Sequence, residues 1–123
     1  MSYITGYVIP VPEGRKEDYR KMAEEAAVMF REYGATEIME AWGEDVRDGK
    51  VTDFRRAVNA EKGENVVFSW IVWPDKATAD AAEKKMIDDD RMSPPPDMPF
   101  DGARMIFGGF APIFEMGRNG SAA

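Results

Sequence analysis

The strongest constraint on the fold comes from residues 65–73, which read Asn-Val-Val-Phe-Ser-Trp-Ile-Val-Trp. Such a run of β-branched and aromatic residues favours a strand, and Pro74 ends it. Successive side chains of a strand point to opposite faces of the sheet. One face carries Val66, Phe68, Trp70 and Val72, and the other carries Val67, Ser69, Ile71 and Trp73. Both faces of the sheet are therefore predicted to be buried.

The periodicity of apolar residues and the residues that end elements predict the rest of the secondary structure. An apolar stripe at helical spacing indicates a long helix, which Gly34 is suited to end. Asp75 is expected to cap a second long helix. For residues 53–60 we favour one or two helical turns capped by Thr52, with a strand as the alternative. In chain order the prediction is strand 3–10, helix 15–33, strand 36–42, helical turns in 53–60, strand 65–73, helix 75 to about 89, and strand 104–115.

Prolines and glycines mark the connections between these elements. Pro10 and Pro12 are expected to close the first strand. Residues 93–102 hold a run of prolines, so they are predicted to form a stiff connecting loop, neither a helix nor an inner strand. The pair Gly108–Gly109 inside the last strand indicates a bulge or the close approach of another backbone.

The order strand, helix, strand, insertion, strand, helix, strand is the split β-α-β pattern of ferredoxin-like folds. We predict one α+β domain over residues 1–116, with a four-stranded antiparallel sheet and both helices on one face, and a flexible tail at residues 117–123. The second apolar face then needs another cover. We expect a homodimer in which the two open sheet faces pack together. The alternative is that the insertion at residues 44–60 folds over this face.

Charge and missing residue types exclude several classes of function. The formal net charge is −7 and the basic residues are flanked by acidic ones, so neither nucleic acid nor a membrane surface is expected as a partner. The chain has no Cys and no His, which excludes disulfides, thiol catalysis, His-ligated haem and His-based zinc sites. No signal peptide or membrane-spanning stretch is visible, so we expect a cytoplasmic protein. We also expect no cofactor.

Five residues are the first candidates for a cleft: Tyr7, Glu40, Trp42, Trp70 and Arg104. Glu40 and Trp42 share a face of their predicted strand, and a carboxylate there requires a partner, for which Arg104 is the candidate. A raised pKa would suit Glu40 to proton abstraction, with Arg104 as the second catalytic candidate. Tyr7, Trp42 and Trp70 are then the ligand-binding candidates. The alternative is a structural ion pair beside core aromatic residues.

The inserted segment and the acidic and methionine residues give weaker signals. Arg55 and Arg56 are candidates to clamp an anionic ligand, and the alternative is a solvated surface or a salt bridge at a dimer rim. The methionines at positions 22, 29, 39, 86, 92, 98 and 105 suit either an adaptable apolar site or ordinary packing. The acidic residues Asp88, Asp89, Asp90, Asp97 and Asp101 do not follow the calcium-loop spacing, so no metal site is expected.

Several longer motifs carry a resemblance to a known family. They are Tyr3–Pro12, Glu40–Val46, Val51–Val58, Val67–Pro74, Met98–Gly102, Arg104–Ile106 and Gly108–Phe110. With these motifs the chain, from residue 1 to about 116, resembles the uncharacterised YbaA-like bacterial family of the dimeric α/β-barrel superfamily. The resemblance implies a ferredoxin-like protomer whose sheet packs on that of a second copy to form a homodimeric α/β barrel. It implies no established activity.

Two hypotheses about function follow. The first is a small dimeric binding or stress-related protein that holds an apolar or aromatic metabolite in a cleft between the sheet and the helices. The second is a cofactor-independent monooxygenase or isomerase that uses Glu40 as its base. The second rests on an analogy with relatives in the superfamily, which include cofactor-free monooxygenases, and fold alone does not establish chemistry. Geometry separates the two, because the second fails if Glu40 and Arg104 point away from any enclosed pocket.

Overall fold

Four strands form one antiparallel sheet in the spatial order β2-β3-β1-β4. The computed structural model describes residues 2–117 of the chain. In it the strands are β1 (Tyr3–Pro12), β2 (Glu37–Trp42), β3 (Glu64–Trp73) and β4 (Ile106–Phe110). The two long strands, β1 and β3, lie at the centre, and β2 and β4 are the edges. The predicted α+β class and four-stranded antiparallel sheet are confirmed.

The two long helices are α1 (Lys16–Glu32) and α3 (Lys76–Asp88). The carboxylate of Asp75 accepts the backbone N–H of Thr78 at 2.7 Å, which is the predicted cap of α3. Gly34 follows α1 with φ +111°, a conformation that favours glycine. Single turns of 3₁₀ helix occur at Glu13–Arg15 and Asp90–Met92.

The insertion between β2 and β3 contains one short helix, α2 (Phe54–Ala57). The helical prediction for this segment is confirmed, but the predicted cap is wrong. Asp53, not Thr52, accepts the backbone N–H of Arg56, at 2.8 Å. The Asp53 carboxylate also accepts a hydrogen bond from the Arg56 guanidinium, at 2.9 Å. A threonine hydroxyl carries no negative charge and could not form this ion pair.

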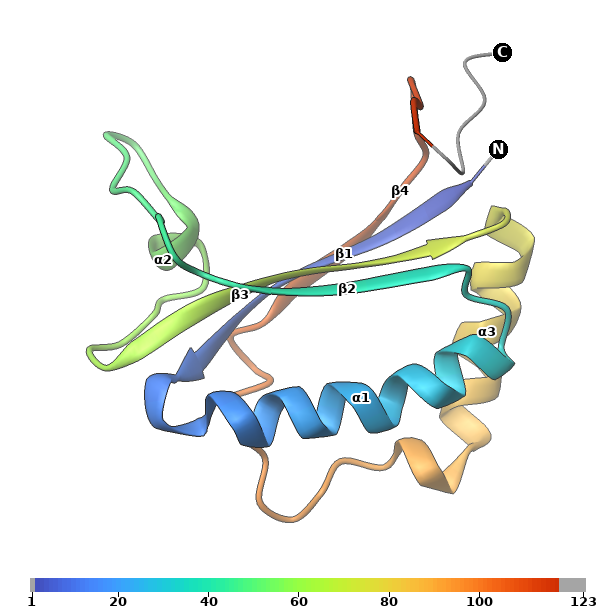
Figure 1. Ribbon diagram of the computed structural model, residues 1–123, viewed down its shortest axis with the longest axis horizontal. Coiled ribbons are helices and arrows are strands. Elements are labelled where there is room, and N and C mark those ends of the chain that lie inside the picture. The colour runs from blue at the N-terminus through green and yellow to red at the C-terminus, as the bar shows by residue number, and fades with distance from the viewer. Residues whose placement is uncertain (1, 118–123) are drawn as a thin grey trace.

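Both long helices cover the same face of the sheet, and we call this the helix face (Figure 1). Odd-numbered residues of β1 and β3 point to it, as the alternation of a strand requires. Near α3 the buried cluster consists of Met29, Tyr33, Ile71, Trp73 and Ala82. Near the start of α1 it consists of Ile9, Val11, Tyr19 and Val67. The core of the chain therefore lies between this face and the helices.

We call the opposite side of the sheet the open face. α2 lies on this side, as Figure 1 shows, and it covers one end, where Val58 and Val66 are buried. The insertion reaches only as far as Phe68, whose ring contacts that of Phe54 at a centroid distance of 5.9 Å. Beyond that point Phe68, Ile106 and Phe110 are 47 %, 44 % and 59 % exposed. Both predicted faces are apolar, but the insertion buries only part of the second.

Two strand boundaries differ from the prediction. β1 continues through both of its prolines to Pro12, because β4 pairs with β1 only from Ile4 to Val8. Beyond Val8 that edge of β1 has no neighbour and needs no N–H donor. β4 stops at Phe110 because it pairs there with Ile4, almost at the start of β1.

The glycine pair of β4 lies in an uninterrupted register, so no bulge is present there. A Cβ at position 109 would lie 2.2 Å from the hydroxyl oxygen of Tyr3. The close approach that the pair indicated is therefore made by a side chain, not by another backbone.

The two ends of the described chain meet beside β1. The backbone N–H and the hydroxyl of Ser2 both donate to the carboxylate of Glu115. Residues 118–123, which make up most of the predicted tail, lie outside the described residues. Within residues 2–117, no helix has both the length and the apolar character needed to cross a bilayer.

Candidate functional site

A cavity of about 440 Å³ lies on the helix face, between the sheet, α1 and the loop that leads from α3 to β4. The sheet contributes Tyr7, Ile9, Ile38, Glu40 and Ser69 to its wall. Methionines from α1 and from the loop line much of the rest, at positions 22, 29, 92, 98 and 105. Few polar atoms thus face a mostly apolar space, which is the usual character of a small-molecule site.

The loop that closes the cavity runs beneath α1 in Figure 1 and is fastened to that helix at two points. Both terminal nitrogens of Arg15 donate to the carboxylate of Asp97, each at 3.0 Å. Arg91 donates to Glu32 at 2.8 Å and also to Asp89, which accepts the hydroxyl of Tyr33. The predicted stiff loop is therefore a wall of the cavity, and the bidentate pair fixes its geometry.

Glu40 is the acidic group of this cavity. Its residue lies on the edge strand β2 and is exposed as a whole, but its carboxylate is lodged between two hydroxyls. Tyr19 donates to Oε1 at 2.6 Å, and Ser69, which is its partner in the register, donates to Oε2 at 3.0 Å. Burial raises the pKa of the Glu40 carboxyl, while these two hydrogen bonds act in the opposite direction.

Tyr7 is the neighbouring polar group. Its ring stacks on Phe107 at a centroid distance of 6.0 Å. It lines the cavity, so its hydroxyl can form a hydrogen bond with a molecule bound there. Burial, followed by the charges of Glu40 and Glu83, raises the pKa of Tyr7 to about 12. The hydroxyl therefore keeps its proton at neutral pH and can donate it in a hydrogen bond.

The predicted cleft residues do not gather in one place. Trp42 lies on the helix face, with the ammonium of Lys16 over its ring at 5.4 Å. Trp70 points to the open face, where its indole N–H donates to Glu37 at 3.2 Å. Only Tyr7 and Glu40 of the five line the cavity. Trp70 cannot reach the cavity because its side chain points to the opposite face of β3 from that of Ser69. Glu40 pairs with Ser69 and therefore lies on the other face from Trp70.

Arg104 does not pair with Glu40, so the predicted ion pair is wrong. Its guanidinium forms a bidentate pair with Glu64 at 2.6 and 2.7 Å and a further bond to Asp101 at 3.0 Å. The hydrogen bonds from Arg104 lower the pKa of the buried Glu64 carboxyl. Arg104 thus fastens the start of β4 to the start of β3, at the covered end of the open face.

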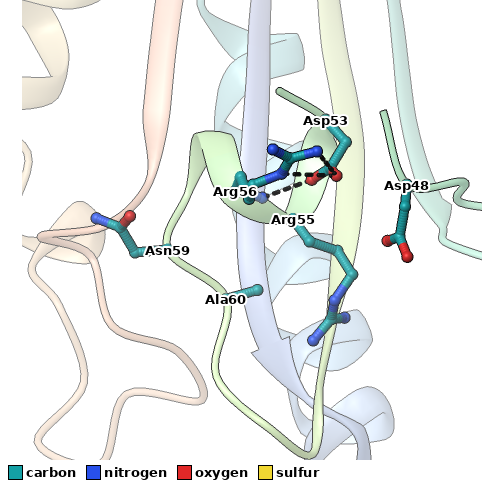
Figure 2. A pocket seen from close by; sticks show the side chains of 6 residues that line it. All are labelled: Asp48, Asp53, Arg55, Arg56, Asn59 and Ala60. Carbon is teal, nitrogen blue, oxygen red and sulfur yellow. Dashed lines mark hydrogen bonds and ion pairs between the residues drawn. The ribbon is translucent and has the colours of Figure 1, made fainter. Parts of the chain in front are cut away.

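The inserted segment forms a second, shallow pocket, shown in Figure 2. Arg56 donates to Asp53 and to the carbonyl of Gly49, and Arg55 donates to the carbonyl of Glu64 at 2.6 Å. Backbone N–H groups of Arg56 and Gly49 lower the pKa of Asp53 to about 2. Since both guanidinium groups already have acceptors, this geometry matches a local salt bridge better than an anion clamp.

Three of the five acidic residues considered for a metal site are paired with cations. Asp89 accepts Arg91, Asp97 accepts Arg15, and Asp101 accepts Arg104. In the described part of the chain no group of three or more acidic side chains is arranged to hold a metal ion.

Sequence reasoning missed the two residues that hold Glu40. Ser69 carries a signal, because it is the one polar side chain in the run Val66–Trp73. Tyr19 carries less, because at helical spacing it counts as a member of the apolar stripe of α1. Its hydroxyl meets Glu40 only when the helix packs across β2 and β3.

Comparison with known proteins places these features in a wider group. The family described as "Protein of unknown function (DUF1428)" matches residues 2–102. The chain is 54 % identical over 116 residues to "Uncharacterized protein YbaA" of Escherichia coli (strain K12), a match that covers 94 % of this chain and 99 % of that protein. The proteins of the same name from Escherichia coli O157:H7 and Shigella flexneri match with the same identity and coverage.

Proposed function

This chain belongs to the DUF1428 family of proteins of unknown function, and from the geometry of its own cavity we propose that it binds a small apolar or aromatic molecule between the sheet and α1. The observation that carries the proposal is the placement of Glu40. A carboxylate is held by two hydroxyl groups inside a methionine-lined cavity. A carboxylate in the wall of an apolar cavity lowers stability unless it is well paired, and its presence here supports a role in binding.

The size and lining of the cavity support the same proposal. About 440 Å³ suffices for a ligand with one or two aromatic rings. Methionine side chains are flexible and polarisable, so they adapt to ligands of different outline. Tyr7 and Glu40 would orient the polar end of such a ligand, because the hydroxyl of Tyr7 can donate a hydrogen bond and the carboxylate of Glu40 can accept one.

A cavity-filling substitution tests this site directly. Ala26 lines the cavity from α1, so Ala26→Phe is expected to weaken the binding of an aromatic ligand at least tenfold. Ala81→Phe places the same side chain on the exposed surface of α3 and is expected to leave binding unchanged. Hits from a thermal-shift screen of aromatic metabolites would be measured by calorimetry. Equal affinity of both variants for every hit would contradict the proposed site.

The second candidate function is proton abstraction with Glu40 as the base. It is favoured by the raised pKa of the Glu40 carboxyl and by its position in the cavity. Arg104 takes no part in it, because it is paired with Glu64. Glu40 would accept a proton from carbon beside a ligand carbonyl, and the electron pair of that bond would form the enolate, to which Tyr7 donates a hydrogen bond. Return of this proton from Glu40 to a different carbon of the delocalised enolate would re-form the carbonyl and complete an isomerisation.

Hydrogen exchange distinguishes catalysis from binding alone. A bound dicarbonyl compound in D₂O should gain deuterium at the acidic carbon, and Glu40→Gln should abolish the gain while binding persists. Nuclear magnetic resonance of the ligand measures both. Exchange that continues unchanged in Glu40→Gln would exclude this residue as the base.

We also propose that the protein is a ferredoxin-like homodimer whose open faces pack together. The support is the apolar centre of the open face, where a cavity of about 630 Å³ is lined by residues such as Ile4, Val8, Phe68 and Trp70. Contiguous apolar surface of this kind is rare on a soluble monomer. Analytical ultracentrifugation at micromolar concentration should give twice the chain mass of 13.8 kDa. A folded species of single mass would contradict this proposal.

A further inference from the structure

The charged residues that line the cavity and its neighbour are mostly acidic: Glu25, Glu40, Asp80 and Glu83, against one basic residue, Arg91. Beyond Tyr7 lies a second cavity of about 360 Å³, between β1, β4 and α3, which has Asp80 and Glu83 in its wall. Tyr7 and Met105 line both cavities, so they form the wall that the two share. The Tyr7 hydroxyl thus lies between Glu40 on one side and Glu83 on the other, and both charges act on it.

No cation of the described chain pairs with Glu40. Arg91 is the basic residue in the wall of the first cavity, and its guanidinium donates to Glu32 and Asp89. In the second cavity Asp80 pairs with Lys76 at 2.7 Å, but Lys76 makes no bond to Glu83 or Glu40. The two hydroxyl donors leave further acceptor capacity on the Glu40 carboxylate, and Glu40 lines the cavity. The cavity therefore contains a negatively charged carboxylate, that of Glu40, for which the described residues supply no cationic partner.

We infer that the ligand carries a positively charged amine on an apolar or aromatic body, and that the ammonium pairs with Glu40 beside the rings of Tyr7 and Tyr19. A carboxylate in an apolar wall gains from a charged partner, because that partner supplies a counter-charge and a hydrogen bond together. The aromatic rings in the wall of the cavity can also attract cations. This inference rests on the proposed binding function and names the class of ligand for that same cavity.

The test compares ligands that differ only in the polar end. Arylethylamines with phenyl and naphthyl rings would be titrated by calorimetry alongside the alcohols and carboxylates of the same skeletons. At pH 7 the amine is expected to bind at least tenfold more tightly than its alcohol, and the carboxylate to bind more weakly than either. The alcohol serves as the neutral reference, since it keeps the size and the hydrogen-bonding capacity.

Substitution of Glu40 assigns the preference to this residue. Glu40→Gln should abolish the preference for the amine, so that the amine binds no more tightly than its alcohol. Glu44→Gln removes the same charge from an exposed position after β2 and should change neither value. Melting curves confirm that both variants are folded.

The outcomes separate this inference from the proposed function. Alcohols that bind as tightly as their amines, or an amine preference that survives Glu40→Gln, would overturn the inference and leave the binding site in place. Failure of all the compounds to bind would overturn both, because the proposed function expects the aromatic body alone to give detectable binding.

Discussion

The helix face and the open face of the same sheet are built from similar apolar residues but have different surroundings. On the helix face Ile71 and Trp73 are 2 % exposed, whereas Phe68 on the open face is 47 % exposed. The polar groups Glu40 and Ser69 lie on the helix face, and the centre of the open face is apolar. A sheet with one face in water shows the reverse distribution. The proposed ligand site thus lies on the covered face, and the proposed dimer contact lies on the open face.

The largest effect on stability should come from truncating a buried side chain on the helix face. Ile71→Ala removes buried methylene groups from the cluster beneath α1 and α3, and it should lower the free energy of unfolding by about 2–5 kcal/mol. Ile87→Ala makes the same change on the exposed side of α3 and should stay within about 0.5 kcal/mol. Urea unfolding at one fixed protein concentration measures both. Similar losses in the two variants would show that the two sites do not differ in packing.

The next effect concerns the open face. Ile106→Glu places a charge where a second copy is proposed to pack, and it should weaken dimerisation at least a hundredfold, or about 3 kcal/mol. Ile87→Glu adds the same charge away from both faces and should leave the mass in solution unchanged. Sedimentation velocity over a range of concentrations measures the association. A dimer that is unaffected by Ile106→Glu must use another surface.

A smaller effect is expected where the open face is already covered. Arg104→Met leaves the buried Glu64 carboxylate without its partner and should lower stability by roughly 1–3 kcal/mol at pH 7. Arg104 lowers the folded-state pKa of Glu64, so the stabilisation is present above the unfolded pKa of about 4.3 and is lost as pH falls through the folded value. The deficit of Arg104→Met should therefore shrink below about pH 4.

The control for this pair is Arg47→Met, which removes an arginine whose salt bridge with Asp45 is exposed to solvent. It should cost less than about 0.5 kcal/mol at any pH. A deficit of Arg104→Met that stays constant from pH 7 to pH 3 would mean that lost packing, not the carboxylate, is responsible.

The smallest effect should be found at Glu40 itself. Burial raises its folded-state pKa, so its contribution to stability is greatest below the unfolded pKa of about 4.3 and falls as pH rises through the folded value. Glu40→Gln removes this ionisation. Its melting temperature relative to the unmodified protein should therefore be higher at pH 7 than at pH 4. The opposite trend would show that the hydrogen bonds of Tyr19 and Ser69 outweigh the burial.

Periodicity and terminating residues were sufficient to predict most of the fold. The two-faced pattern of residues 65–73, the cap at Asp75 and the glycine at Gly34 are local signals, and each is confirmed. The cap of α2 was misassigned because Thr52 and Asp53 are both good caps, and only the bond to Arg56 distinguishes them. The last strand was predicted too long because its end depends on where β1 begins, which is not a local property.

The candidate site was predicted less well, because it depends on contacts between distant elements. Glu40 was identified as an unusual carboxylate from strand phase alone, but its partner was not. Tyr19 is separated from it by 21 positions and Ser69 by 29, whereas Arg104 is drawn to Glu64 by the path of the loop before β4. Spacing along the chain fixes which face a side chain points to. It does not fix which of several distant charges reaches that face.

The bond between Ser2 and Glu115 has a consequence for the order of the elements. Because these residues touch, a short peptide could join them and make the described chain a closed ring. The exposed loop around Gly49 and Lys50 is then a natural place to open the ring again, since both residues are at the surface. Such a circular permutant would begin in the insertion and still contain every strand pairing of the sheet. The architecture is thus determined by which elements are neighbours and not by which is synthesised first.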